Sequence, residues 1–366
     1  MKMNYNTHTL ANGLRIIHLP SAQPVVYCGY AVGAGTRDEE LGREEGMAHF
    51  CEHITFKGTE RRSSMQILGH LESVGGDLNA FTNKEETVYH AAVLKENIDR
   101  AVDLLTDIVF HSTYPQAEID KEVEVIVDEI ESYNDSPAEL VYDLFENAVF
   151  GGHPLGHNIL GTAEKLRRYT TADALRFTRR YYRPENSVFF AYGDVDFQKL
   201  VRLLERANAA DAAAESVAAV SLPPQQSAIS DNSCCGGGKD TAAALLPPYV
   251  AQHIEHHMDT HLAHVMLGTR AYDVHDERRI ALYLLNNILG GPGMTARLNV
   301  SLRERNALVY TVESMAQSYS DTGLWAVYFG CDPKNVKRCL RLIRRELDKV
   351  MQRPLSDAQL RAAKRQ

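Results

Sequence analysis

Along the N-terminal part of the chain, some segments alternate apolar and polar residues, which predicts short strands, and others repeat apolar residues every three or four positions, which predicts amphipathic helices. Strands are expected at residues 9–10, 14–19, 25–32, 79–82 and 87–94, and helices at residues 45–56, 65–74, 98–110 and 116–133. The dipeptide Asn12-Gly13 favours a tight hairpin turn between the first two strands. Pro115 suits the first turn of the last helix, and Gly75-Gly76 suits the end of the second. The pattern therefore predicts a mixed α and β fold.

The periodic pattern stops at about residue 208 and resumes at about residue 249. Between these points lie Ala, Ser, Gln, two Pro-Pro pairs and the run Cys234-Cys235-Gly236-Gly237-Gly238, a composition typical of a flexible linker. After it, residues 264–270 resemble residues 30–37, and each segment leads into an acidic turn and then a helix. We therefore expect two homologous domains, at residues 1–207 and 249–366, joined by a linker at residues 208–248.

Each domain is expected to be a mostly antiparallel sheet packed with helices, so that the fold class is α+β. Because a long linker joins the two domains, we expect them to form a clamshell. The chain ends within a helix-like pattern at residues 361–366, whereas the first half continues through residues 181–204, beyond the comparable point. The second domain is therefore expected to lack its last strand and helix.

Composition and charge exclude several classes of function. The chain has 366 residues, of which 44% are hydrophobic and 24% charged, as in an ordinary globular protein. Its net charge of −9 offers no support for a nucleic-acid partner. The only dense group of basic residues, which we interpret as a solvated helix face, is Lys337, Arg338, Arg341, Arg344 and Arg345.

The sequence gives no indication of export or of a membrane partner. The N-terminus has no apolar core of a signal peptide, and no window approaches the roughly 18 uninterrupted apolar residues of a membrane span. Six cysteines scattered over this length do not form a disulfide framework. We therefore expect a cytoplasmic protein without a transmembrane helix.

The pentapeptide His49-Phe50-Cys51-Glu52-His53 is the strongest chemical signal in the chain. On a helix, positions i and i+4 share one face, so His49 and His53 can hold one metal ion with Glu52 on the same side. This H-x-x-E-H spacing is the inverse of the commoner H-E-x-x-H zinc motif. Because short His/Glu patterns also occur on ordinary helix surfaces, a third ligand decides between a zinc site and a solvated face. The corresponding helix of the second half, at residues 281–287, lacks these residues.

The predicted helix at residues 116–133 supplies many acidic candidates for the third ligand. They are Glu118, Asp120, Glu122, Glu124, Asp128, Glu129 and Glu131. Glu122 and Glu129 lie about two helical turns apart and so share one face. Periodicity alone does not tell which acid meets the two histidines, and most of these side chains are expected to be solvated.

Residues 49–59, His49-Phe50-Cys51-Glu52-His53-Ile54-Thr55-Phe56-Lys57-Gly58-Thr59, resemble the signature of the pitrilysin (M16) metallopeptidases. That family includes the mitochondrial processing peptidase and insulin-degrading enzyme, and the chain is similar to its processing-peptidase-type bacterial members. The family's third zinc ligand is a glutamate about 76 residues past the second histidine, which corresponds to Glu129. A glutamate two turns earlier supports the site in the family, and it corresponds to Glu122.

Two further segments resemble functional elements of the family. Residues 77–82 are similar to its substrate-binding edge strand, which would assign Asn79, Ala80 and Phe81 to peptide binding. In the second half, Arg303 and Tyr310 are similar to the family's C-terminal R-x6-Y element.

The resemblance implies a zinc-dependent endopeptidase that acts on extended or unfolded peptides enclosed between the two domains. One Zn2+ per chain would be held by His49, His53 and Glu129, and Glu52 would exchange the proton of the attacking water. Tyr310 would stabilise the oxyanion, and Arg303 would bind substrate carbonyls. Because two-domain members of the family often pair, a homodimer or a heterodimer with a related subunit is expected by analogy.

Two alternatives remain open from the sequence. The chain can be a non-catalytic or partner-dependent peptide-binding subunit of the same fold, although such subunits lose the ligands or the glutamate that are present here. A second metal site at His253, His256, His257 and His261 has helical spacing, but this segment fits the approach to a strand better.

Overall fold

The computed structural model describes residues 4–219 and 246–365, apart from the side chains of residues 210–219. Contacts within the chain divide it into two units, each of which is described by itself. The first unit comprises Met1–Ile130 and Asn158–Leu245, and the second comprises Glu131–His157 and Leu246–Gln366.

A six-stranded sheet organises the first unit. Its strands are β1 (Asn6–Thr9), β2 (Arg15–Pro20), β3 (Val25–Val32), β4 (Asp77–Thr82), β5 (Thr87–Leu94) and β6 (Ser187–Gly193). They lie in the order β1-β2-β6-β3-β5-β4, and every neighbouring pair is antiparallel except β2 and β6. Among the described strands, β4 therefore lies at one edge of the sheet, next to β5.

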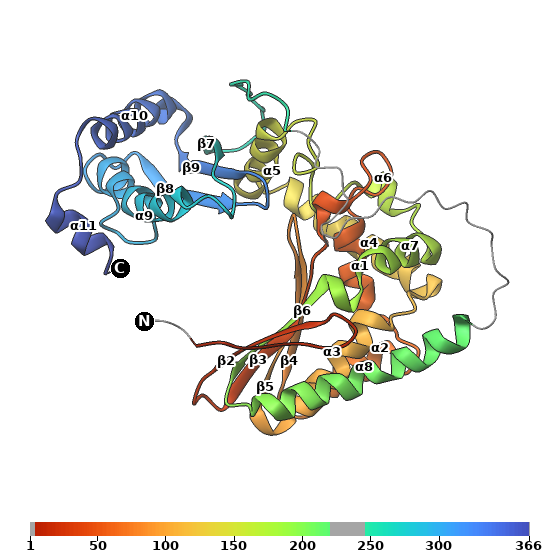
Figure 1. Cartoon of the computed structure of the whole chain (residues 1–366). Helices are drawn as coiled ribbons and strands as arrows, with labels where there is room; N and C mark the ends of the chain where they lie inside the picture. The colour runs from red at the N-terminus through yellow and green to blue at the C-terminus, as the bar shows by residue number, and fades with distance from the viewer. Residues whose placement is uncertain (1–3, 220–245, 366) are drawn as a thin grey trace, which may run out of the picture. The chain divides into compact units, whose positions relative to one another are not determined.

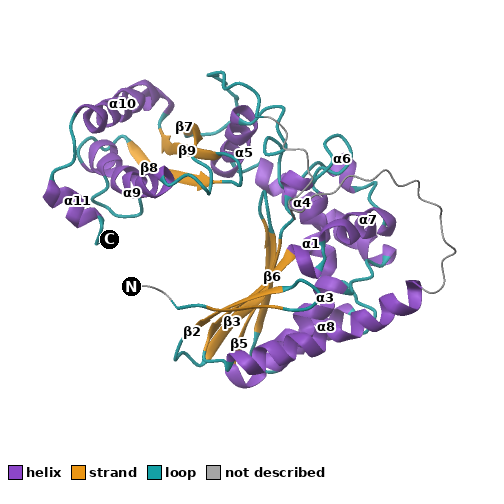
Figure 2. Cartoon of the chain, viewed as in Figure 1, coloured by secondary structure: helices purple, strands orange, loops and turns teal. Residues whose placement is uncertain are grey.

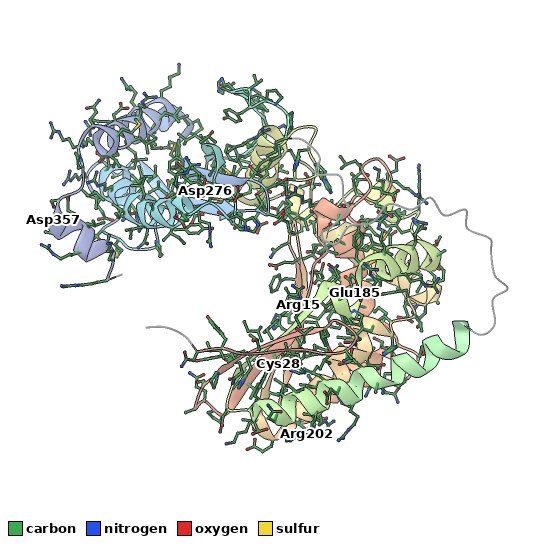
Figure 3. The ribbon with its side chains drawn as sticks, in the orientation of Figure 1. Arg15, Cys28, Glu185, Arg202, Asp276 and Asp357 are labelled. Carbon is green, nitrogen blue, oxygen red and sulfur yellow. The ribbon has the colours of Figure 1, made fainter. Side chains whose placement is uncertain are left out.

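Helices gather on one face of this sheet (Figure 1; Figure 2). They are α1 (Met47–Thr55), α2 (Ser64–Glu72), α3 (Ile98–Phe110), α4 (Gln116–Asn134, to Ile130 in this unit), α6 (Ala163–Leu166), α7 (Thr171–Tyr181) and α8 (Phe197–Ala219). Alternate residues of β3 and β6 face these helices, and Cys28, Tyr30 and Phe189 are completely buried. Figure 3 labels Cys28 among the side chains of this unit. In the described parts of the chain, no helix combines the length and apolar character needed to cross a membrane.

The second unit contains a smaller sheet with its own helices. Its strands, in the order β7-β9-β8, are β7 (Ala263–Ala271), β9 (Gly323–Cys331) and β8 (Val309–Ser318), and both pairs are antiparallel. The helices are α5 (Pro137–Val149), α9 (Arg278–Gly290), α10 (Val336–Gln352) and α11 (Asp357–Ala363), with a π-helical turn at Asn299–Glu304. Leu298, Leu302, Phe329 and Ile343 are completely buried in its core.

The mixed α and β pattern predicted from the sequence is confirmed, with shifts at several ends. The helix at residues 98–110 and the strands at residues 25–32 and 87–94 have the predicted bounds. Helix α2 ends at Glu72 instead of residue 74, and Gly75 follows with a positive φ of 73°. These shifts are local, because capping contacts decide where a helix ends and periodicity does not.

The division of the chain differs from the predicted boundaries at two places. Residues 208–219, assigned to the linker, continue α8 to Ala219, because alanine has the highest helix propensity and dominates this segment. The linker residues 220–245 lie outside the described residues. Residues 131–157, assigned to the first domain, group with the second unit, where α5 packs against β7.

The start of α1 is fixed by a buried carboxylate. Glu39 is 5% exposed, and its two oxygens accept hydrogen bonds from the backbone N–H groups of Gly46 at 2.9 Å and Ala48 at 2.8 Å. Gly46 has φ 85°, and a Cβ there would lie 2.8 Å from the backbone of Gly161. A carboxylate at a helix N-terminus satisfies unpaired N–H groups and complements the helix dipole. These contacts therefore fix the first turn of α1 as far as Ala48, the residue before His49.

Replacing Glu39 by glutamine is expected to lower the free energy of unfolding by roughly 2–3 kcal/mol. One carboxylate oxygen becomes an amide NH2 group, which cannot accept a hydrogen bond from the backbone N–H group that it faces, and the negative charge is lost. Urea-induced unfolding measures the loss. The control is Glu40→Gln, because Glu40 is a neighbouring surface carboxylate whose contacts among the described residues are with Arg43 and Arg180. Equal losses in the two variants would show that Glu39 has no special role in holding α1.

Candidate metal centre

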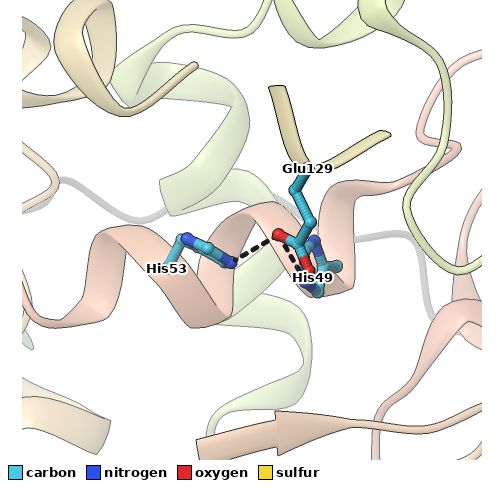
Figure 4. A group of neighbouring side chains, drawn as sticks. All are labelled: His49, His53 and Glu129. Carbon is cyan, nitrogen blue, oxygen red and sulfur yellow. Dashed lines mark ion pairs between the residues drawn. The ribbon is translucent and has the colours of Figure 1, made fainter. Parts of the chain in front are cut away.

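Three side chains that the sequence singles out converge in the first unit. His49 and His53 lie one turn apart on α1, and Glu129 reaches them from α4 (Figure 4). Oε2 of Glu129 lies 3.8 Å from Nε2 of His49 and 3.4 Å from Nε2 of His53. Among the described residues, these three are the only group of His, Cys, Asp or Glu whose potential ligand atoms all lie within 4.8 Å of one another.

The geometry and donor types of this group fit zinc. Ligand atoms at about 2.0–2.2 Å from a tetrahedral zinc ion lie about 3.3–3.6 Å apart, close to the two distances to Glu129. Two imidazoles and one carboxylate leave a fourth position for water or substrate, as in catalytic zinc sites. Nδ1 of His49 is buried, and in the described part of the chain it has no hydrogen-bond partner.

The electrostatics of His49 favour a neutral ring. Burial, together with the neighbouring His53, lowers the pKa of His49 to about 4. A neutral imidazole keeps a lone pair available for a metal ion. Glu129 is held in its charged form, because its contacts with His53 and His49 keep the pKa of its carboxyl below the ordinary value. His49 and Glu129 therefore offer a metal ion one neutral nitrogen ligand and one anionic oxygen ligand.

His53 lies at the end of a short chain of polar contacts. Its Nδ1 is 3.1 Å from Oε1 of Glu122, and Nζ of Lys57 is 2.6 Å from Oε2 of the same carboxylate. Burial opposes a charge on His53, but its contacts with Glu122 and Glu129 outweigh burial and raise its pKa to about 9. Burial likewise opposes the charge on Glu122, yet His53 and Lys57 lower the pKa of that carboxyl. Without a metal ion, the surroundings of His53 thus favour a cation, and the proton on Nε2 must leave before that nitrogen can bind a metal ion.

Glu52 lies on the same helix beside this group and has a different environment. Burial raises the pKa of its carboxyl above the ordinary value, and the charge of Glu129 acts in the same direction. The hydroxyl of Thr82, at the end of β4, donates a hydrogen bond of 2.6 Å to Oε2 of Glu52. A half-buried carboxylate with a raised pKa is suited to accept a proton near neutral pH.

The predicted peptide-binding residues lie on β4, at the edge of the sheet. Asn79 is exposed, Phe81 is 44% exposed, and Ala80 packs against the core of the unit. An edge strand has one row of backbone groups without a neighbouring strand, so an extended peptide can pair with it.

Arg303 and Tyr310 both belong to the second unit. Arg303 is exposed on the π-helical turn, and Tyr310 is 67% exposed near the start of β8. The pairing of β8 with β9 shifts between Val309 and Thr311, so Tyr310 occupies a bulge. A bulge redirects the side chain of the extra residue and is a common device beside functional sites. Their part in the chemistry stays a prediction.

Sequence reasoning missed two contacts of the site. Lys57 follows the end of α1 at Thr55, and in the sequence it stands out only as part of the family signature. Thr82 was recognised only as the end of an edge strand, and no spacing links it to Glu52. The alternative histidine cluster at residues 253–261 is exposed and precedes β7 without forming a helix.

Comparisons with known proteins identify the family of the chain. Residues 16–163 match the family profile described as insulinase (peptidase family M16), and residues 168–366 match that of the peptidase M16 inactive domain. An "uncharacterized zinc protease" of Streptomyces coelicolor is 36% identical over 354 residues, which cover 96% of this chain and 73% of the relative. Another of Bacillus subtilis is 32% identical over 361 residues, which cover 98% of this chain and 81% of the relative.

Solved structures show the same fold. A protease from Helicobacter pylori has a TM-score of 0.81 at 22% identity, covering 99% of this chain and 83% of that one. A peptidase M16 inactive domain from Pseudomonas fluorescens has a TM-score of 0.80 at 19% identity, covering 99% and 82%. The resemblance inferred from the sequence is confirmed, and the chain belongs to the M16 family of peptidases.

Proposed function

We propose that this chain is a zinc-dependent endopeptidase that hydrolyses extended or unfolded peptides. The observation that carries the proposal is the convergence of His49, His53 and Glu129 in one group, with Glu52 beside them. Relatives that are called zinc proteases support the same chemistry. One zinc ion per chain would be held by the two imidazoles and the carboxylate of Glu129.

Zinc at this position would polarise the peptide carbonyl and lower the pKa of a water molecule toward about 7. Glu52 then accepts a proton from the attacking water and delivers it to the leaving amine. Its raised pKa suits this exchange, because a stronger base takes up the proton more readily.

Glu122 and Lys57 would fix the orientation of His53. Since Glu122 lies 3.1 Å from Nδ1 of His53, that nitrogen carries the proton and Nε2 faces Glu129 and the metal position. Lys57 holds the second oxygen of Glu122 and prevents the carboxylate from turning toward the ligand group.

The substrate would bind as an added strand along β4. Main-chain hydrogen bonds to the edge strand supply affinity without demanding a particular sequence, and alternate side chains of the peptide meet Asn79 and Phe81. This mode requires an extended peptide, because a folded segment cannot offer a free row of backbone groups. Peptides without stable structure are therefore the proposed substrate class.

Arg303 and Tyr310, both of the second unit, are proposed to take part in the reaction. Tyr310 would donate a hydrogen bond to the oxyanion that forms as water attacks, and Arg303 would bind nearby carbonyls of the peptide. Exposure of both side chains and the bulge at Tyr310 support this assignment.

Replacing Glu52 by glutamine is expected to reduce peptide cleavage by at least about 100-fold while zinc content stays unchanged, because the amide cannot accept the proton and does not ligate the metal. Cleavage of an unstructured fluorogenic peptide and metal analysis of the same preparation measure the two effects.

Two variants of α4 serve as comparisons for Glu52→Gln. Glu129→Gln is expected to lose both zinc and cleavage, whereas Asp128→Asn, at an exposed neighbouring position, should retain both. Native-rate cleavage by Glu52→Gln would contradict the assigned role of Glu52.

Replacing Tyr310 by phenylalanine is expected to lower kcat roughly 100- to 1000-fold, the usual effect of removing one oxyanion donor, with normal zinc content. Steady-state kinetics on the same peptide give kcat and KM. Tyr249→Phe is the matched control, since Tyr249 is also an exposed tyrosine of the second unit. A normal kcat in Tyr310→Phe would remove Tyr310 from the mechanism.

A further inference from the structure

The hydrogen bond between Thr82 and Glu52 joins two parts of the proposed site that have separate roles. Thr82 is the last residue of β4, the strand proposed to bind the peptide, and Glu52 is the proposed base on α1. Because a carboxylate only accepts, the threonine hydroxyl is the donor in this 2.6 Å contact. The oxygen it binds is Oε2, and among the described residues no hydrogen bond is made to Oε1 of Glu52.

Strand geometry determines that Thr82 faces the helix. Side chains of a strand alternate between its two faces, so Leu78, Ala80 and Thr82 share one face, while Asn79 and Phe81 lie on the other. Leu78 and Ala80 pack against the core, and Thr82 is only 9% exposed. Threonine is branched at Cβ and has few χ1 rotamers, which fixes the direction of its hydroxyl once the strand is in place.

We propose that Thr82 is a positioning residue that orients Glu52, the proposed base, from the last position of the strand proposed to bind the peptide. The hydroxyl holds Oε2, so that Oε1 is presented for the proton of the attacking water. Pairing of Thr82 with Thr87 of β5 holds the backbone that carries this hydroxyl. The inference rests on the proposed endopeptidase function and adds a residue that positions its base.

The central variant is Thr82→Val, which removes the hydroxyl and keeps the shape of the side chain. We expect kcat to fall roughly 10- to 100-fold, as a misplaced general base loses part of its contribution, while KM for an unstructured peptide changes by less than about three-fold. Thr82→Ser retains the hydroxyl and is expected to restore kcat to within about three-fold of the unmodified protein. Zinc content should be the same in all three proteins.

Thr87, which lies opposite Thr82 on the neighbouring strand β5, provides a matched control. Thr87 on β5 pairs with Thr82 in the strand register, is completely buried, and donates its hydroxyl to the carbonyl of Ala34. Thr87→Val removes an equivalent hydroxyl from the same strand pair without touching Glu52, and kcat is expected to stay normal. Thermal unfolding of each variant verifies that the preparations are folded.

The outcomes separate this inference from the function on which it rests. With an active unmodified protein, a normal kcat in Thr82→Val, an equal loss in Thr82→Ser, or an equal loss in Thr87→Val would each overturn the role of Thr82. If the unmodified protein showed no chelator-sensitive cleavage, the proposed function itself would fail, and this inference with it. A loss confined to kcat in Thr82→Val and rescued in Thr82→Ser supports it.

Discussion

The spacing of His49 and His53 on one helical face is the constraint on which the rest of the site depends. One turn of α1 brings the two imidazole rings to a centroid distance of 4.6 Å, and Glu129 approaches both from α4. A neutral His49 beside an ionised Glu129 provides the mixed donor set that zinc favours. Any shift of α1 along its axis would separate these donors, so the helix must be held from outside the ligand group.

The surrounding structure holds α1 at its start, its end and its side. Glu39 binds the backbone at the N-terminus, and Lys57 with Glu122 fixes the face that carries His53. Thr82 contacts the helix from the edge strand through Glu52. A ligand arrangement that is fixed before the metal binds avoids the entropic cost of ordering flexible side chains. The three supports therefore serve the same end, although they are far apart in the sequence.

Much of the fold could be predicted from the sequence, because strand and helix periodicities are local signals, and the family resemblance predicted that His49, His53 and Glu129 lie together. The pentapeptide gave two donors by spacing alone, but Glu129 required the family resemblance, since periodicity does not show which helices meet. The continuation of α8 to Ala219 was missed because an alanine-rich segment resembles a linker in composition. Lys57 and Thr82 were missed because their partners, Glu122 and Glu52, are brought to them by packing.

The most direct test of the account is peptide cleavage by the full chain as a chelator removes its metal and zinc is then returned. We expect about one zinc per chain, loss of cleavage in parallel with loss of zinc, and recovery on zinc addition. The unstructured peptide should be cut at the same bonds before removal and after restoration. Cleavage that persists after the zinc has been removed would contradict the central claim that His49, His53 and Glu129 hold the catalytic metal.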